Sequence, residues 1–151
     1  MKTFLKITFL ITSLLIGGCN SSSTSSRRRT EPSFSSSQNY DYKMVNDRII
    51  FWSNIFSINK ENYCVYFFSK TCSHCSSLKS FIIEYALSHE NIYFVEASEQ
   101  TIFLEDVSTT IGLSSIEGFG ILGYPSLIKI SDKLITLNIA GVFEIKNELL
   151  N

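Results

Sequence analysis

The chain has 151 residues, of which 44% are apolar, 13% aromatic and only 18% charged, so it contains the material for a hydrophobic core. Its 13 basic and 14 acidic residues nearly balance, and nothing in that balance suggests nucleic acid as a partner. No internal repeat is visible, and residues 43–151 amount to one domain once the polar segment before them is set aside.

The N-terminus has the pattern of a secretory signal. Lys2 and Lys6 form a short basic start, and the apolar run over residues 7–16 is too short to cross a bilayer as a helix. The sequence IGGC, which ends this run at Cys19, resembles a bacterial lipobox. Signals of that family are cut before the cysteine, which receives a diacylglyceryl anchor. The resemblance therefore implies a lipoprotein signal peptide over residues 1–18 and a lipidated Cys19.

An ordinary signal peptide that happens to contain a cysteine is the alternative to this lipoprotein signal. Cleavage before Cys19 would remove Lys2 and Lys6, leaving 11 of the 13 basic residues against 14 acidic ones. The mature net charge is then −3, which again gives no reason to expect a nucleic-acid partner.

Residues 19–42 are rich in serine and low in complexity, with one aromatic residue before Tyr40. Such a composition cannot bury enough apolar surface to offset chain entropy, so we expect a disordered tether. About 24 flexible residues have an r.m.s. reach of roughly 25–30 Å, enough to hold a domain just off a membrane surface. The run Arg27, Arg28 and Arg29 could contact anionic head groups, although a short basic run in a linker is more often only solvated.

Residues 47–58, DRIIFWSNIFSI, follow a helical period, and Asp47 is a candidate for the N-cap. The face that this helix would turn toward the core consists of Val45, Ile49, Trp52 and Phe56. Residues 62–69, NYCVYFFS, are a dense run of β-branched and aromatic residues. Apolar character on both sides of this run predicts a central strand that is covered on both faces.

The sequence CSHC follows this strand at once, with Cys72 and Cys75 three positions apart. The residues after it keep helical spacing to about Ser88, with an apolar stripe of Leu78, Phe81, Ile82 and Tyr85. The two cysteines therefore lie where a buried strand turns into a helix, and we expect Cys72 at or near the helix N-terminus.

A further βα unit is expected after this helix. Residues 91–97, NIYFVEA, predict a second strand, and residues 104–111 predict a helix that ends at Gly112.

The C-terminal third predicts two more strands and a last helix. Residues 126–130 and 134–139 are the strands, and the connection between them is so short that they must pair as an antiparallel hairpin. Gly141 precedes a closing helix whose apolar positions are Val142, Ile145 and Leu149. The complete order of elements predicts a layered α/β domain.

This arrangement resembles the thioredoxin superfamily. A strand leading into CxxC at a helix N-terminus, a further βα unit, and GYPS at residues 123–126 before a hairpin and a last helix carry the resemblance. It covers residues 62–151 well and residues 44–60 more loosely. The segment VYFFSKTCSHC is also similar to bacteriocin-transport accessory proteins, and GYPSLIKI is similar to protein disulfide isomerases. The resemblance implies a compact thioredoxin fold, with a central mixed β-sheet flanked by helices, and a cis Pro125 that faces the cysteines.

The sequence departs from this family in two respects. Thioredoxins usually carry a buried acid six residues before the first cysteine, but Tyr66 occupies that position here. A phenol with a reference pKa near 10 is a poor base at neutral pH, which argues against fast thioredoxin-style exchange. Only residues 76–123 lie between the CxxC and Pro125, which leaves no room for the helical domain inserted in DsbA-like proteins.

The CxxC position favours thiol–disulfide chemistry, because the unpaired N–H groups of a helix N-terminus stabilise a thiolate. Cys72 would be the attacking thiol, and His74 would add to the stabilisation of its thiolate, with weaker contributions from Lys70 and Lys79. Cys75 would resolve the mixed disulfide. The family resemblance implies that the backbone beside Pro125 pairs with an extended substrate, and Tyr124 is the neighbouring residue here.

Two other interpretations of CSHC remain open. A purely structural disulfide would close a very short loop and would contribute little chain-entropy stabilisation. A metal site would need further ligands, and no second CxxC or HxxxH is present, although Cys64 together with His74 could complete a set. Cys64 and Trp52 are more typical of core residues, and His89 of a helix end.

The sequence thus predicts an extracytoplasmic thiol–disulfide oxidoreductase held at the cell membrane by its lipid anchor. Its expected partners are extracytoplasmic protein thiols and disulfides and a redox recycling partner of unknown identity, and it needs no cofactor. The alternative is a non-enzymatic, thioredoxin-like lipoprotein that binds a partner or a metal. The His in CSHC predicts a site more oxidising than thioredoxin, because stabilising the thiolate favours the reduced form of the site.

Overall fold

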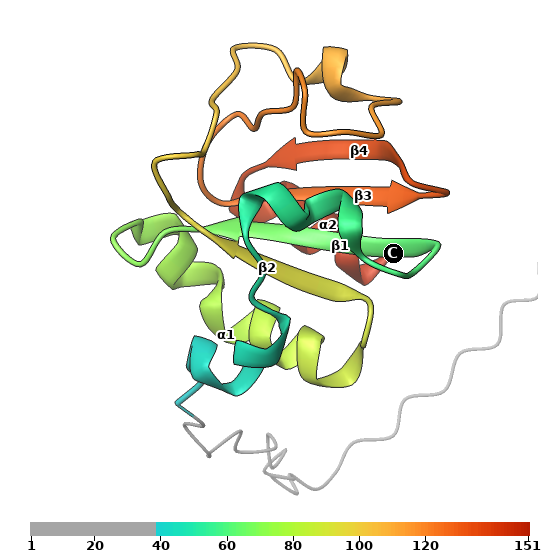
Figure 1. Ribbon diagram of the computed structural model, residues 1–151. Helices are drawn as coiled ribbons and strands as arrows, with labels where there is room; N and C mark the ends of the chain where they lie inside the picture. Colours follow the sequence, from blue (N-terminus) through green and yellow to red (C-terminus); the bar gives the residue numbers. More distant parts are fainter. Residues whose placement is uncertain (1–38) are drawn as a thin grey trace, which may run out of the picture. The chain divides into compact units, whose positions relative to one another are not determined.

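The computed structural model describes residues 39–151, so the predicted signal peptide, Cys19 and most of the predicted tether lie outside the described residues. Within residues 39–151, no helix is both long enough and apolar enough to cross a membrane. The elements in chain order are η1 (Tyr42–Arg48), η2 (Trp52–Ser57), β1 (Asn62–Phe68), α1 (Ser73–Ser88), β2 (Ile92–Glu96), η3 (Ser108–Thr110), β3 (Ser126–Ser131), β4 (Leu134–Ala140) and α2 (Val142–Leu150), where η denotes a 3₁₀ helix (Figure 1).

The four strands form one mixed sheet in the order β2-β1-β3-β4. β1 pairs in parallel with β2 and antiparallel with β3, and β3 pairs antiparallel with β4. The apolar run of β1 therefore lies in the middle of the sheet, where both of its faces are buried, as the sequence predicts. Because β1 is an inner strand, Cys72 follows its C-terminal end in the middle of the sheet and not at an edge strand.

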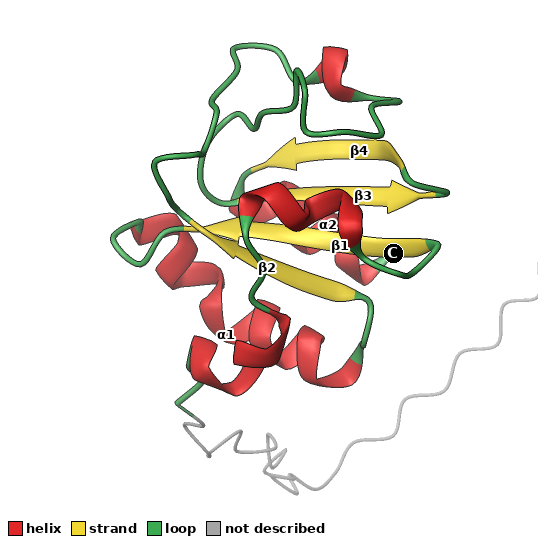
Figure 2. Cartoon of the chain, in the orientation of Figure 1, coloured by secondary structure: helices red, strands yellow, loops and turns green. Residues whose placement is uncertain are grey.

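Alternate residues of β1 face two separate cores. One core lies under α1, α2 and η1 and contains Cys64, Tyr66 and Phe68, and we call this side of the sheet the helix face. The other core contains Tyr63, Val65 and Phe67 and is covered by η2 and the long segment between β2 and β3, and we call it the loop face. Figure 2 shows α1 and α2 on one side of the sheet and η2 on the other.

The predicted single helix over residues 47–58 is wrong. Two 3₁₀ helices replace it, and Ile49 between them forms a parallel bridge to Phe94, while the Ile50 N–H donates to the Phe94 carbonyl at 2.8 Å. The chain thus crosses the free edge of β2, so Val45 packs on the helix face and Trp52 on the loop face. A single helix would have kept both on one side. The N-cap is Asp41, whose side chain accepts from the Lys43 N–H, and not Asp47.

The boundary predicted at residue 43 falls inside η1. Asp41 caps this helix and Tyr42 is buried in the core of the helix face, so both belong with the domain.

The helix predicted over residues 104–111 is also wrong, because this segment holds only the three-residue η3. Side chains here form hydrogen bonds with backbone groups that a helix would otherwise use. Asp106 accepts from the Ser108 N–H at 2.8 Å, and the Thr110 hydroxyl donates to the Val107 carbonyl at 2.6 Å. Ile111 is the C-cap of η3, and Gly112 follows it with a φ of +87°, a conformation that suits glycine.

The segment over residues 97–125 is long for an irregular connection, yet it is firmly attached. The Asn138 side-chain amide on β4 donates to the Thr110 hydroxyl at 3.0 Å and to the Gly120 carbonyl at 2.9 Å. Backbone bonds join Gly112 and Leu113 to Ile135, so this segment covers the outer edge of β4 at that residue. Phe119, which belongs to this segment, packs its ring against Trp52 of η2.

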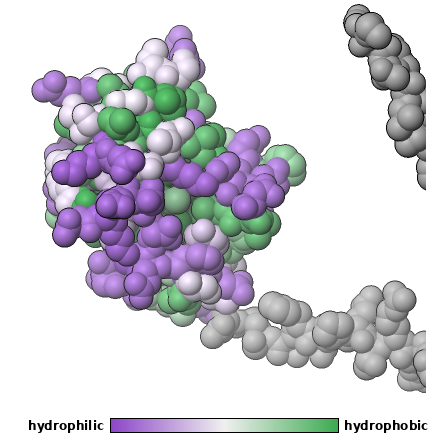
Figure 3. Space-filling view, turned by 90° about the vertical axis from the view of Figure 1, so that its right-hand side faces the viewer, coloured by the Kyte–Doolittle hydropathy of each residue, from purple (hydrophilic) through white to green (hydrophobic). Residues whose placement is uncertain are grey.

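The β3–β4 turn and the CxxC lie at opposite ends of the sheet. Figure 3 views the molecule from the end that carries the β3–β4 turn, and hydrophilic side chains occupy most of the surface seen there, with hydrophobic patches between them. Asp132 and Lys133 form this turn, both with positive φ. The CxxC lies at the opposite end, at the C-terminus of β1.

Candidate active site

Cys72 is the N-cap of α1, as the sequence predicts. Its φ and ψ of −85° and 122° are extended, and its Sγ accepts a hydrogen bond from the Cys75 N–H at 3.2 Å. A sulfur in this position faces the unpaired N–H groups of the first helical turn, which favour a negative charge. The half-buried Cys72 is therefore placed to act as a nucleophile.

Cys75 lies one turn further along α1 and is buried, with 1% of its surface exposed. Burial, followed by the hydrogen bond to Cys72, raises the pKa of the Cys75 thiol to about 12, although the Ser69 backbone and the Tyr66 hydroxyl act in the opposite direction. Cys75 thus holds its proton at neutral pH in this reduced state, in which both cysteines are free. This contrast in exposure matches the roles expected of an attacking and a resolving thiol.

The segment GYPS is next to the cysteines, and the Tyr124–Pro125 bond is cis, as the resemblance implies. The Cys72 Sγ is 3.5 Å from the Tyr124 carbonyl oxygen, to which the thiol can donate. The Cys72 sulfur thus contacts both the backbone of the cis-proline segment and the first turn of α1. The Pro125 carbonyl accepts from the Gly141 N–H at 3.0 Å, which ties the segment to the end of β4.

His74 is exposed in the first turn of α1, between the two cysteines. Its backbone carbonyl accepts from the Ser77 hydroxyl at 2.8 Å, but its imidazole makes no hydrogen bond or ion pair with any described residue. Lys70 is engaged elsewhere, in an ion pair of 2.8 Å with Glu96. Lys79 is half-buried beside Cys75, where both line one small pocket.

The structure adds residues that the sequence analysis did not single out. The Tyr124 hydroxyl donates to the Thr101 hydroxyl at 2.8 Å, and the Phe103 ring meets the Tyr124 ring edge-on at 5.4 Å. No local pattern predicts these contacts, because Thr101 and Phe103 come from the irregular segment that the sequence assigned to a helix and its approach.

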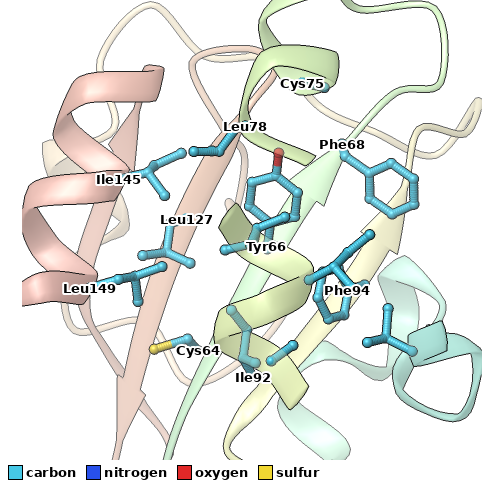
Figure 4. Packing of buried hydrophobic residues seen from close by; sticks show 14 of the residues in the cluster. Cys64, Tyr66, Phe68, Cys75, Leu78, Ile92, Phe94, Leu127, Ile145 and Leu149 are labelled. Atoms are coloured by element: carbon cyan, nitrogen blue, oxygen red, sulfur yellow. The ribbon is translucent and has the colours of Figure 1, made fainter. Parts of the chain in front are cut away.

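Tyr66 is on the helix face of β1, and Figure 4 shows its hydroxyl directed toward the α1 turn that carries Cys75. Strand alternation places Tyr66 on the same face of β1 as Cys64. Tyr42, on η1, is the second tyrosine near this position, and its pKa is raised by burial and influenced by Tyr66. Its part in the site could not be predicted, since the sequence placed Tyr42 in the tether.

The other residues considered for the site lie elsewhere. Cys64 is buried in the core of the helix face, and Trp52 in the core of the loop face, as predicted. His89 is the C-cap residue of α1, where its ring stacks on Tyr85 at 3.9 Å. Within residues 39–151, no group of three or more His, Cys, Asp or Glu is arranged to hold a metal ion. Cys19 lies outside the described residues.

No protein-family model matches the chain, and no curated protein is a significant match to it. Solved structures similar to it include mitochondrial thioredoxin 3 from Saccharomyces cerevisiae, at 11% identity and a TM-score of 0.47, which covers 71% of this chain and 96% of that one. Thioredoxin from Plasmodium falciparum is similar at 18% identity and a TM-score of 0.46, covering 68% and 96%. Thioredoxin f from spinach chloroplast is similar at 11% identity and a TM-score of 0.46, covering 72% and 90%.

At these identities and scores the likenesses carry no conclusion about activity. The fold follows from the chain's own architecture: a mixed sheet in the order β2-β1-β3-β4, a CxxC at the first turn of the helix after the central strand, and a cis-proline beside it. Residues 39–151 therefore form a compact thioredoxin-like domain without an inserted helical domain.

Proposed function

We propose that the chain is a thiol–disulfide oxidoreductase that acts on protein thiols and disulfides outside the cytoplasm, while tethered to a membrane. The observation that carries the proposal is the pairing of a half-exposed Cys72 at the N-cap of α1 with a fully buried Cys75 one turn later, beside the cis-proline segment. A structural disulfide would not require that the two sulfurs differ in this way.

The geometry supports a two-step exchange. The Cys72 thiolate attacks one sulfur of a substrate disulfide, which forms a mixed disulfide and releases the other substrate sulfur as a thiolate. Cys75 then attacks the Cys72 sulfur, so that the Cys72–Cys75 bond forms and the second substrate thiolate leaves. Two electrons pass from the cysteine pair to the substrate, and the reverse sequence oxidises a substrate dithiol.

An extended polypeptide is the substrate class that this surface fits best. No inserted helical domain is present within residues 39–151 to cover Cys72, and the Tyr124 carbonyl oxygen is 3.5 Å from the attacking sulfur. Phe103, 56% exposed, packs edge-on against Tyr124 and offers an apolar contact for a client side chain. Pairing of a strand-like segment with this backbone would place its cysteine near Cys72.

The membrane anchor is proposed from the sequence, in which IGGC ends a short apolar run at Cys19. Cells producing the Cys19→Ser variant would be fractionated, and we expect that variant to leave the membrane fraction while the wild type stays in it. Equal membrane association of both proteins would refute the lipid anchor without affecting the redox proposal.

The redox function is tested by trapping. We expect Cys75→Ser to accumulate mixed disulfides with client proteins, because the resolving thiol is gone, and Cys72→Ser to accumulate none. Acid quenching followed by non-reducing gels would show the adducts. Cys64→Ala is the matched control, since it removes a buried cysteine away from the site and should behave as wild type.

Equal trapping by Cys72→Ser and Cys75→Ser, or by neither, would count against the enzyme. Zinc that co-purifies one-to-one with the reduced protein would favour the alternative of a metal-binding accessory module.

A further inference from the structure

Two tyrosine hydroxyls are buried beneath the CxxC without a partner. The hydroxyls of Tyr42 and Tyr66 are both inaccessible to solvent, and neither makes a hydrogen bond of acceptable geometry with any described residue. A buried hydroxyl without a partner is costly and is rare in folded proteins, so the pair requires an explanation. Phenylalanine at either position would fill nearly the same volume without that cost.

The two tyrosines are near neighbours in one aromatic stack. The Phe68 ring lies parallel to both: its centroid is 3.8 Å from that of Tyr42 and 6.1 Å from that of Tyr66. The two hydroxyls are close enough for each to influence the pKa of the other, and the Tyr66 hydroxyl is close enough to Cys75 to influence that thiol. Small side-chain movements that bring these polar atoms within hydrogen-bond distance would therefore connect Cys75, Tyr66 and Tyr42 in sequence.

A pocket of about 160 Å³ adjoins this row of groups. Both Tyr42 and Cys75 line it, together with polar residues, and none of the substrate-facing residues Cys72, Tyr124 or Pro125 does. Its volume has room for several water molecules. The pocket thus reaches the resolving thiol from a side that does not include these substrate-facing residues.

We propose that Tyr66 and Tyr42 form a relay that carries the proton of Cys75 to water in this pocket when Cys75 attacks the mixed disulfide. The proposal rests on the exchange reaction proposed above and assigns the path of its proton. A phenol can accept a hydrogen bond and donate one at the same time, so it can pass a proton along without ever becoming a free base. This role differs from that of a buried carboxylate, which would itself take up the proton.

The step balances as follows. The Cys75 S–H bond breaks as the Cys75–Cys72 S–S bond forms, and the bond between Cys72 and the substrate sulfur breaks to release a substrate thiolate. Tyr66 receives the proton from Cys75 and gives its own to Tyr42, which in turn gives its own to water that reaches the Tyr42 hydroxyl from the pocket, so both phenols end neutral. In the oxidising direction the departing Cys75 thiolate regains a proton along the same path.

The resolving step must remove a proton from Cys75, because burial, as the largest cause, raises the pKa of this thiol to about 12. Other groups that face this thiol or its pocket bear on any pH profile. They are Cys72 at the N-cap of α1, Lys79 on α1, Tyr66 on β1, Tyr42 on η1 with its cap Asp41, Lys70 after β1, Glu96 on β2 and Tyr124 before β3. None of these is removed by the substitutions below except the two tyrosines themselves.

The test follows both thiols in one reaction. The reduced full-length protein is mixed with a symmetrical aryl disulfide whose released thiolate is coloured, so attack by Cys72 gives a first phase and resolution by Cys75 gives a second. We expect Tyr66→Phe to leave the first phase unchanged and to slow the second about tenfold, less than the roughly 10²–10⁴-fold of a directly positioned acid or base, because pocket water can replace a hydroxyl in part. The second phase should also shift its pH dependence to higher pH, and Tyr42→Phe should slow it by a smaller factor.

Tyr63→Phe is the matched control. It removes a buried hydroxyl from the same strand, but on the loop face, where that hydroxyl donates to the Ile55 carbonyl at 2.8 Å. It should leave both phases and their pH profiles unchanged. A second phase that is unaffected by Tyr66→Phe would overturn the relay and would indicate direct proton loss from Cys75 to the pocket. A wild-type protein that lacks the second phase would instead refute the exchange reaction itself, so the two failures are distinguishable.

Discussion

The helix face and the loop face of the sheet differ in whether their buried hydrogen-bond donors have an acceptor. On the helix face, Cys75, Tyr66 and Tyr42 lie in one core, and both phenols are left without a partner. On the loop face, the Tyr63 hydroxyl donates to a carbonyl, and the Asn138 amide holds Thr110 and Gly120. Donors that are satisfied stabilise a fold, whereas donors left free beside a reactive thiol are available for chemistry.

The contrast assigns reactivity to one face of the central strand β1 and structural support to the other. Alternate residues of β1 point to the two faces, so the strand that positions the CxxC also separates a reactive core from a purely structural one. Substitutions on the loop face should change stability alone. Substitutions in the part of the helix face next to Cys75 should change stability and the reactivity of the cysteines together.

The largest effect is expected from Phe119→Ala on the loop face. Phe119 is fully buried, with its ring centroid 4.9 Å from that of Trp52 and 5.9 Å from that of Phe67. Truncation should lower the free energy of unfolding by about 3–5 kcal/mol, as is usual for a buried aromatic residue. Urea denaturation would measure this loss. In the fraction that remains folded, both phases of the thiol reaction should keep their wild-type rates.

Leu78→Ala is the comparison on the helix face. Leu78 is fully buried one turn after Cys75, and its truncation should cost about 2–5 kcal/mol. Because the cavity would open beneath the resolving thiol, the second phase should also change in rate and in pH dependence. If Phe119→Ala altered the cysteines as much as Leu78→Ala does, the separation of the two faces would be wrong.

The two faces also differ in how well the sequence predicts them. The helix face depends on local patterns: alternation in β1, helical spacing after Cys75, and a cysteine at the position where a cap must fall. The loop face depends on contacts that are distant in sequence, such as Asn138 with Gly120. Helical periodicity alone could not show that Ile49 bridges to Phe94 and divides the expected first helix.

The candidate site follows the same division. The cysteines, the proline and the direction of Tyr66 could be predicted from motif and strand parity. The involvement of Tyr42 could not, because an isolated tyrosine at the end of a Ser-rich segment carries no periodic signal, and only the packing of η1 against α1 brings it under the CxxC.

The stability of the helix face should depend on alkaline pH through Cys64. Burial is the largest cause that raises the pKa of this thiol from 9.0 to about 11. Between pH 9 and 11 the unfolded chain releases this proton while the folded chain keeps it, so the free energy of unfolding falls as pH rises. Below pH 9 this contribution is fully present. We expect Cys64→Ala to remove about 2 kcal/mol of the alkaline loss.

Denaturation curves at neutral pH and above pH 9 would measure this difference. The variant should cost some packing free energy at neutral pH, and the gap to wild type should close as pH rises. Other buried groups with raised pKa values, including Tyr66 and Cys75, also lower the free energy of unfolding at alkaline pH, but they do so in both proteins. Only the difference between the two curves therefore reports on Cys64. A gap that does not change with pH would contradict the assignment.

Asn138→Ala tests how the loop face is held. The substitution leaves the Thr110 hydroxyl and the Gly120 carbonyl without their donor, and it should cost about 1–2 kcal/mol. Amide hydrogen exchange should become faster across residues 97–125, because the side chain ties this segment to β4. Asn147→Ala, at an exposed position of α2, is the control and should change neither quantity. Faster exchange in α1 instead would show that the segment is held by other contacts.

The smallest expected effect concerns His74, which is exposed between the two cysteines and whose imidazole makes no hydrogen bond or ion pair with the described residues. An imidazole here can stabilise the Cys72 thiolate by donating a hydrogen bond or by its positive charge. Stabilising the reduced form makes a site more oxidising. His74→Gly should therefore lower the reduction potential by about 30 mV, which corresponds to roughly 1.4 kcal/mol for a two-electron couple. Equilibration with glutathione would measure the shift.

Ser73→Gly is the control for this substitution, because it places the same flexible residue at the adjacent exposed position of the same turn without removing an imidazole. It should leave the potential unchanged, whereas equal shifts in both variants would assign the effect to the helix backbone. The wild-type value itself decides the direction of the chemistry. We expect it to lie above the potential of thioredoxin, which is about −270 mV. A value at or below that, with no change in His74→Gly, would assign the site to reduction, since the thiolate would then gain nothing from the histidine.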